Sequence, residues 1–205
     1  MTLTRKHMYA IKLLDENNYI YFTFIAGNKN MGYVFEVYKY VSNTIEYDNI
    51  EYISKQKSLF PERYIVAYVQ ESDKNILTKV GKIAIDYKSR NINIFERSCS
   101  LYSSIESLNS ILELPDNYTN DDYYASVIKA AKEGKKVFAK NWDIIQYSVS
   151  STGKLDYVNE YKKIGKLDEK YYNCMIFGTA YLIEDIIEYF RNGIDRITAE
   201  MIIYR

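Results

Sequence analysis

The chain has very few of the residues on which most catalytic and metal sites depend. Its 205 residues include one histidine, His7, and two cysteines, Cys99 and Cys174. A Ser-His-Asp or Cys-His catalytic system would have to use His7, which no recognisable motif surrounds. A histidine-based zinc site is excluded, because one histidine and two widely separated cysteines do not supply the usual ligand spacing. We therefore expect no catalytic residue, no bound metal and no other cofactor, and we expect both cysteines to be reduced thiols.

The sequence also lacks a charge excess and a long apolar segment. Lysine and arginine together number 27, as do aspartate and glutamate, so the formal net charge is zero. A dedicated nucleic-acid-binding protein usually carries a basic excess, so we find no strong signal for nucleic-acid binding. No segment approaches the roughly 18–20 apolar residues of a membrane-spanning helix, and charges interrupt the N-terminal region where a signal peptide would be apolar. We expect a cytoplasmic protein with no membrane association.

Proline is scarce and tyrosine is abundant, with 2 and 23 residues respectively. Hydrophobic residues make up 47% of the chain and occur along its whole length, which is typical of a globular protein. The tyrosine content has two interpretations. A low-GC genome would produce it through AT-rich codons. Alternatively, the tyrosines form a recognition surface, because each offers a large rigid face with a polar tip.

Residues 1–100 show the β-branched, aromatic and alternating patterns of strands. The expected strands are Met8–Leu14, Tyr19–Ala26, Tyr33–Tyr40, Ile45–Ile53, Arg63–Gln70, Val80–Tyr87 and Asn91–Glu96. Turn-forming residues separate the last two strands, which predicts a hairpin. Successive hairpins imply a mostly antiparallel sheet.

A helical pattern follows these strands. The spacing of one face of an amphipathic helix is present in Leu101, Ile105, Leu108 and Leu112, and Pro115 ends it. Polar, turn-forming residues come next, so we place a domain boundary there. The expected domains are 1–115, a β-rich domain with a closing helix, and 116–205, a small α+β domain.

The second half of the chain mixes helical and strand patterns. A first helix is expected to have Asp121 or Asp122 as its cap and to end at Gly134. A second is expected between Thr179 and Gly193. The expected strands are Val137–Trp142, Ile144–Val149, Leu155–Tyr161 and Ile197–Tyr204. The predicted fold class is α+β, with an N-terminal, mostly antiparallel β-sheet, a connecting helix and a small C-terminal α+β unit.

One stretch, residues 124–142, resembles a known family. It consists of an aromatic residue, an alanine-rich helix, a Gly-Lys step and a basic strand that ends in tryptophan. The matching residues are Tyr124, Ala131, Gly134, Lys135 or Lys136, Val137, Lys140 and Trp142. The pattern is similar to the opening of the Thoeris anti-defence 2-like phage domain, and the hairpin expected at 144–161 would continue it. The chain departs from that family at Asp143, where glycine is common, and at its C-terminal segment, which lacks the family's short acidic, tryptophan-containing end.

The resemblance implies binding rather than catalysis, because such domains sequester cyclic nucleotide signals made by bacterial immune enzymes. On that basis Lys136 and Lys140, expected on one face of a strand, contact phosphates. Trp142 or a nearby tyrosine then stacks on a base. The alternative interpretation is that Trp142 packs in a core and that both lysines are solvated.

The functional hypothesis is a non-catalytic phage or mobile-element accessory protein that binds a ligand or host partner in the bacterial cytoplasm. Its most concrete form is anti-defence by sequestering a cyclic nucleotide immune signal, so the partner is a small nucleotide or a host defence protein. The alternative is a structural or protein–protein interaction subunit of a phage particle or complex, with tyrosine-rich strands as interfaces. An enzyme with a carboxylate, tyrosine or lysine site is a third alternative. A homo-oligomer is compatible with each.

Overall fold

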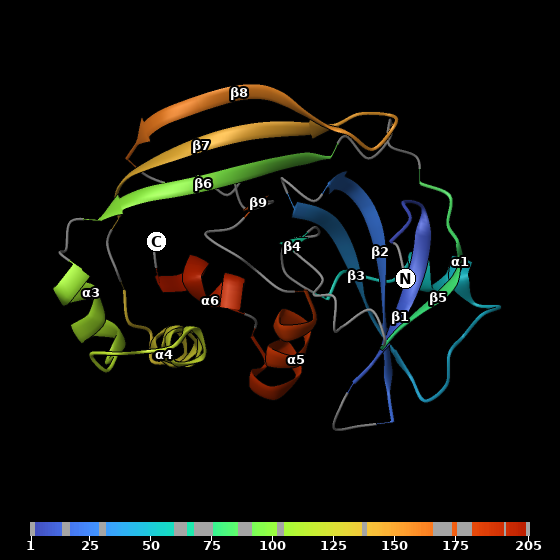
Figure 1. Ribbon diagram of the computed structural model, residues 1–205, viewed down its shortest axis with the longest axis horizontal. Coiled ribbons are helices and arrows are strands. Elements are labelled where there is room, and N and C mark those ends of the chain that lie inside the picture. The colour runs from blue at the N-terminus through green and yellow to red at the C-terminus, as the bar shows by residue number, and fades with distance from the viewer. Residues whose placement is uncertain are drawn as a thin grey trace.

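The computed structural model confirms the α+β class, with two β-sheets and helices packed against both (Figure 1). It describes residues 3–13, 17–28, 32–59, 65–67, 76–85, 92–101, 105–136, 139–165, 174–175, 182–194 and 196–203. No helix within those ranges has both the length and the apolar content needed to cross a membrane.

The first sheet is antiparallel, with the strand order β4-β3-β2-β1-β5. Its strands are β1 (His7–Lys12), β2 (Tyr19–Asn28), β3 (Gly32–Ser42), β4 (Ile65–Ala67) and β5 (Leu77–Lys82). The antiparallel N-terminal sheet was predicted from the sequence. Its central strands contribute side chains to one hydrophobic cluster on each face, so neither face is left to solvent. Residues 21–26 are accordingly buried at every position.

Aromatic rings fill one face of this sheet. Tyr9 and Phe22 stack with ring centroids 5.6 Å apart, and Phe35 meets Phe22 edge-on at 5.5 Å. All three side chains are completely buried. Offset and edge-on arrangements are the favourable geometries for aromatic pairs, so these rings form the centre of the first core.

The second sheet has the strand order β8-β7-β6-β9, with β6 and β9 parallel and the other pairs antiparallel. Its strands are β6 (Asn93–Leu101), β7 (Ala139–Val149), β8 (Leu155–Ile164) and β9 (Cys174–Met175). In Figure 1 it arches over the helices. The second sheet combines β6, which precedes the domain boundary predicted at residue 115, with β7, which follows it. The boundary itself stays a prediction.

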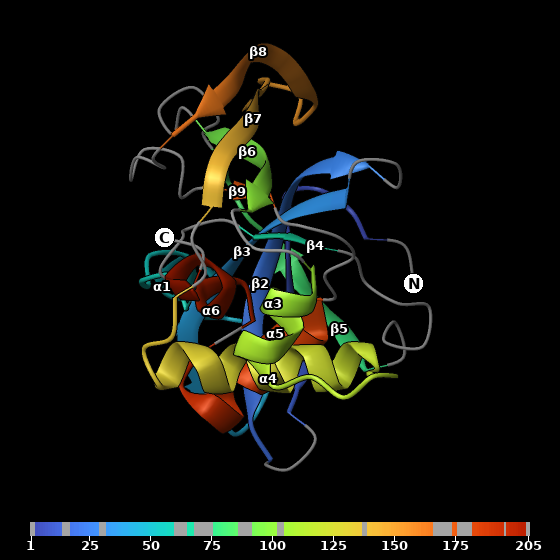
Figure 2. The ribbon, with the colours of Figure 1, turned by 90° about the vertical axis from the view of Figure 1, so that its left-hand side faces the viewer.

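The helices divide between the two sheets. They are α1 (Ile50–Ser54), α3 (Ile105–Leu112), α4 (Asn120–Lys132), α5 (Leu182–Asn192) and α6 (Arg196–Ile203). Buried residues of α3, α4 and α6 form one core with Trp142 and Ile144 of β7. Helix α5 instead packs Ile183 and Ile186 against the first sheet. Helices α4 and α5 therefore belong to different cores, and Figure 2 shows α4 running across the molecule beneath the second sheet.

The predicted hairpin of Val80–Tyr87 and Asn91–Glu96 is wrong. Strand β5 pairs with β1 in the first sheet, whereas β6 pairs with β7 and β9 in the second. Residues 86–91, where the predicted turn falls, lie outside the described residues. Alternation of apolar residues identifies the buried face of a strand but does not identify its partner, so adjacent strands of the chain were assigned to each other.

Two predicted strands are helical. Ile50–Ser54, which overlaps the second half of the expected strand Ile45–Ile53, forms α1, and Ile53 is its buried residue. Most of the expected last strand, Ile197–Tyr204, lies in α6, and Tyr204 is outside the described residues. Ala199 and Ile203, four residues apart, are both completely buried, as on one helix face. The β-branched residues favoured strand, and helical packing overrode that preference.

Three further boundaries differ from the sequence prediction. Leu101 ends β6, so α3 begins only at Ile105. The described part of β7 is one strand rather than two, with Val137 outside the described residues. Thr119, not an aspartate, caps α4. The glycine ends of the helices are confirmed, because Gly134, after the C-cap Glu133 of α4, and Gly193, after α5, have φ values of 71° and 72°.

Candidate functional site

A capping box fixes the start of α4. The Thr119 hydroxyl accepts a hydrogen bond from the backbone N–H of Asp122 at 3.2 Å, and the Asp122 carboxylate accepts one from the Thr119 backbone N–H at 2.8 Å. The Thr119 hydroxyl also donates to that carboxylate at 2.8 Å. These hydrogen bonds lower the pKa of Asp122. The capping box occupies Asp122 and leaves the neighbouring Asp121 carboxylate available for another role.

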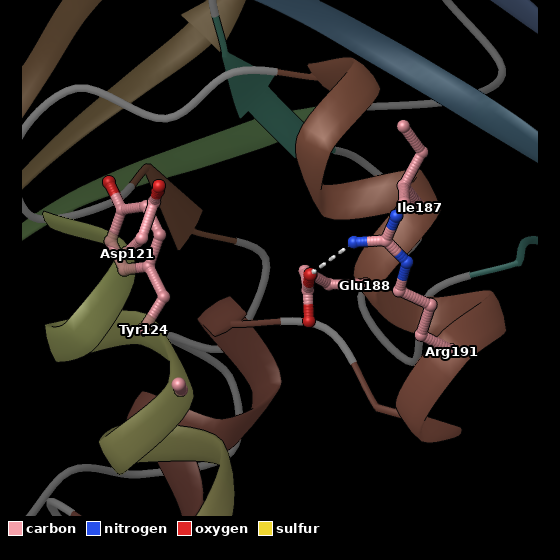
Figure 3. Close-up of a pocket in the computed structure, with 6 residues that line it drawn as sticks. Asp121, Tyr124, Ile187, Glu188 and Arg191 are labelled. Carbon is pink, nitrogen blue, oxygen red and sulfur yellow. Dashed lines mark ion pairs between the residues drawn. The ribbon is translucent and has the colours of Figure 1, made fainter. Parts of the chain in front are cut away.

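Helix α5 presents a polar side to α4. Ile183 and Ile186 bury one side of α5 in the first core, which leaves Ile187, Glu188 and Arg191 toward α4. Figure 3 shows Asp121 and Tyr124 on α4 and these three residues on α5, across the space between the helices. The seam between the two cores is therefore lined mainly by polar side chains, beside Ile187 at the edge of the first core.

Two adjoining pockets lie along this seam, and we call them together the α4–α5 groove. They have volumes of about 470 and 410 Å³ and share Ala125 and Glu188. The first is lined by Asp121, Tyr124, Ala125, Ile187, Glu188 and Arg191. The second is lined by Ala125, Ile128, Lys129, Lys132, Glu133, Glu188 and Asn192. Both volumes fall within the roughly 300–1,000 Å³ of small-molecule sites.

The first pocket has an acidic character. Glu188 is held on both carboxylate oxygens, by Asn192 Nδ2 at 2.6 Å and by Arg191 Nη1 at 3.5 Å. Asp121, by contrast, makes no hydrogen bond or ion pair within the described part of the chain. The first pocket therefore contains one engaged carboxylate and one that is open to a ligand.

The second pocket is lined by two lysines and two glutamates. Lys132 Nζ donates to Asn192 Oδ1 at 3.0 Å and so connects α4 to α5. Lys129 forms an ion pair with Glu113, which follows α3. The hydrogen bond and charge of Glu113 raise the pKa of Lys129, so its ammonium group is fully charged at neutral pH. Glu133 and Glu188 line the same pocket and balance the two lysines in formal charge.

The ring of Tyr124 is held in place by a buried charged pair of α6, Arg196 and Glu200. The guanidinium carbon of Arg196 lies 4.5 Å from the centre of the Tyr124 ring. Arg196 Nη1 also pairs with Glu200 Oε1 at 3.3 Å, and both residues are at most 5% exposed. A cation–π contact of this kind is worth up to about 2 kcal/mol when it is desolvated. The ring therefore forms a rigid aromatic wall of the first pocket.

The residues predicted to bind a ligand lie elsewhere. Trp142 is 4% exposed and packs in the core between the second sheet and the helices. Lys136 is exposed and donates from Nζ to the carbonyl of Ile202 in α6 at 2.7 Å. Lys140 lies in β7, and its side chain is outside the described residues. Because Lys136 precedes the described strand, its shared face with Lys140 also stays a prediction.

Only weak signals for the groove are present in the sequence. Tyr124 belonged to the stretch that carried the family resemblance, and Asp121 was interpreted as a helix cap. Glu188 and Arg191 have the spacing of an ordinary solvated helix face. A periodic pattern shows which side of a helix is polar but does not show which other helix lies opposite it, so α5 and α4 could not be brought together.

Comparisons with protein-family models, curated proteins and solved structures found no match to this chain. The resemblance to the Thoeris anti-defence 2-like domain therefore stays a prediction. Among the residues that the structure describes, no group of three or more His, Cys, Asp and Glu side chains is arranged to hold a metal ion.

Proposed function

We propose that this protein acts by binding a small ligand without chemical turnover, and that it sequesters a cyclic nucleotide signal in a bacterial cytoplasm. The proposal joins the sequence resemblance to a site that the resemblance did not predict. In this proposal the ligand occupies the α4–α5 groove.

The observation that carries the proposal is the pairing of an aromatic wall with two lysines along one groove. Tyr124 lines the first pocket, and Lys129 and Lys132 line the second. A nucleotide combines a flat base, which stacks on aromatic rings, with phosphates, which attract lysines. The two shared lining residues place these features side by side, so one ligand can contact both.

A thermal-shift screen against cyclic and linear nucleotides tests this proposal. A ligand that binds only the folded state raises the unfolding temperature, so we expect a shift of several degrees with one nucleotide. Chromatography of the released ligand should show that it is chemically unchanged. Absence of a shift with every nucleotide would contradict sequestration, and conversion of the ligand would indicate an enzyme.

Matched lysine substitutions locate the site. Lys132→Gln removes one positive charge from the groove, whereas Lys136→Gln and Lys140→Gln each remove one from the position implied by the family resemblance. We expect Lys132→Gln to weaken binding and the other two to leave it unchanged. The opposite pattern would move the ligand to Lys136 and Lys140.

A protein–protein interaction subunit is the second candidate, favoured by the exposure of β8. This strand forms one edge of the second sheet, and Tyr157 and Val158 are 63% and 48% exposed. Exposed tyrosines are common at protein interfaces. Light scattering of the purified protein with and without the Tyr157→Ser change tests the self-associating form: a multimer that the change dissociates supports it, and a monomer contradicts it.

A further inference from the structure

The side chains along the groove distinguish among nucleotides, an inference that rests on the proposed function. We infer that the α4–α5 groove takes a guanine nucleotide, with the base on Tyr124 and Asp121 and the phosphate toward Lys129 and Lys132. Asp121 and Tyr124 are three residues apart on α4, as are Lys129 and Lys132, so each pair lies on one side of the helix and lines one of the two pockets.

Tyr124 is suited to stacking because its position is set before a ligand arrives. Arg196 is buried and contacts the ring at 4.5 Å, while the same ring lines the first pocket. A cation held against one face of a ring draws its electron density toward that side. An electron-rich purine is then a favourable partner for the exposed part of the ring.

Asp121 supplies the base-reading contact. A carboxylate only accepts hydrogen bonds when ionised, so it selects a base edge that presents donors. Glu188 is less suited to this role, because Asn192 and Arg191 already contact its two oxygens. Asp121 lines the same pocket as Tyr124, three residues away on α4, so a base stacked on the ring has an edge within the pocket that Asp121 lines.

Guanine matches this acceptor better than the other bases do. Its Watson–Crick edge carries two adjacent donors, N1–H and the N2 amino group, which can bind both oxygens of one carboxylate. Adenine and cytosine present one donor beside a ring-nitrogen acceptor, whose lone pair a carboxylate repels. Uracil presents one donor between two carbonyl acceptors. The donor pair therefore identifies guanine.

The two lysines fit the other end of the nucleotide. At the helical rise of 1.5 Å per residue, Lys129 lies about 12 Å along α4 from Asp121. Lys129 and Lys132 line the second pocket, which joins the first at Ala125 and Glu188. With the base in the first pocket, the phosphate lies in the second, where it replaces Glu113 as the partner of Lys129 and lies beside Glu133.

Calorimetric titration with GMP, IMP, AMP and guanosine tests the base and the phosphate separately. IMP lacks only the N2 amino group, and guanosine lacks only the phosphate. We expect GMP to bind about tenfold more tightly than AMP, as a charge-assisted hydrogen bond implies, with IMP between them. Guanosine should bind more weakly than GMP, and added salt should remove that difference.

Asp121→Asn is the decisive variant, because Asp121 has no partner within the described residues whose loss would unfold α4. It should reduce GMP binding to the level of AMP and leave AMP binding unchanged, with an unaltered unfolding temperature. Tyr124→Ala should weaken all four ligands, and Tyr124→Phe should restore them. Lys162→Gln, on the exposed strand β8, is the control for lost surface charge.

The outcomes separate this inference from the proposed function. Equal affinity for GMP and AMP, or an equal effect of Asp121→Asn on both, would overturn the guanine assignment while nucleotide binding stands. Failure of all four ligands, together with every cyclic nucleotide, would overturn both. Loss of GMP binding in Lys162→Gln would show that the groove is not the site.

Discussion

The two sheets differ in how completely they are buried. In the first sheet, β1, β2 and β3 have long runs in which every residue is buried, because a hydrophobic cluster covers each face. In the second sheet, β8 is exposed along almost its whole length, with only Leu155, Tyr161 and Ile164 partly covered. The molecule therefore combines a structural sheet that is enclosed with a sheet whose outer strand is open to solvent.

Strand β8 carries features that limit edge-to-edge association. Its pairing with β7 shifts register twice, and Lys163 has a φ of 54°, so the strand is irregular. Lys162 and Lys163 place two charges near its end. Bulges and lysines are the usual means by which exposed edge strands avoid pairing with other chains. The exposed strand is thus tolerated because its geometry and charge discourage aggregation.

The largest effect is expected in the first sheet. Phe22→Ala removes a completely buried ring that packs between Tyr9 and Phe35. Loss of a buried phenylalanine lowers the free energy of unfolding by about 3–5 kcal/mol. Denaturant unfolding measures the change, and Phe22→Leu should recover most of it. A loss below about 1 kcal/mol would show that the first sheet is not the enclosed core described above.

A smaller loss is expected for Trp142→Ala in the second sheet. Trp142 packs with Ile144, Val127 and Ala199, but the exposed strand β8 leaves this core more room to relax. We expect about 3 kcal/mol, at the low end for a buried tryptophan, with nucleotide affinity retained. Unchanged stability with lost affinity would instead make Trp142 the ligand-stacking residue that the sequence suggested.

The next effect concerns α4, which borders the groove between the two cores. Thr119→Ala removes the hydroxyl that accepts the Asp122 N–H. Loss of such a cap typically costs about 1 kcal/mol. Thermal unfolding should show the loss, and Thr119→Ser should restore stability because it retains the hydroxyl. An equal loss in both variants would mean that the threonine methyl group, rather than the cap, is responsible.

The sequence predicted local structure better than it predicted partners. The strand patterns of residues 1–40 and the glycine ends of α4 and α5 were correct because they depend on neighbouring residues alone. The pairing of β6 with β7 was missed, since it joins Cys99 to Trp142 across more than forty residues. The local pattern of apolar residues carries no information about contacts between residues so far apart in the chain. The groove was missed for the same reason, because it brings together Asp121 of α4 and Glu188 of α5, two helices that pack in different cores.

Almost no loss is expected at the exposed strand. Tyr157 is 63% exposed, and its ring only meets that of Tyr147 edge-on at 6.5 Å. Tyr157→Ser should change the free energy of unfolding by less than about 0.5 kcal/mol, as is usual for surface substitutions. Denaturant unfolding beside Phe22→Ala gives the direct contrast. A loss comparable with that of Trp142→Ala would show that β8 is covered in solution, as in an assembly.

The smallest effect lies outside both sheets and is seen through its pH dependence. Hydrogen bonds from Lys129 and Lys135 lower the pKa of Glu113 from 4.5 to about 2. A carboxyl group whose pKa is lower in the folded state stabilises that state above its unfolded pKa. The contribution of Glu113 is therefore complete above pH 4.5 and is lost as the pH falls toward 2. Glu113→Gln should be slightly less stable than the parent protein at pH 6, and the difference should be mostly lost at pH 2 and vanish below it.

Salt provides the control for this last prediction. Glu113 is half-exposed, and ion pairs at the surface are weak and screened by salt. The difference between the parent protein and Glu113→Gln at pH 6 should therefore shrink as salt is added, whereas that of Phe22→Ala should not. A difference that persists at both low pH and high salt would mean that the Glu113 side chain stabilises the junction of α3 and α4 by packing rather than by charge.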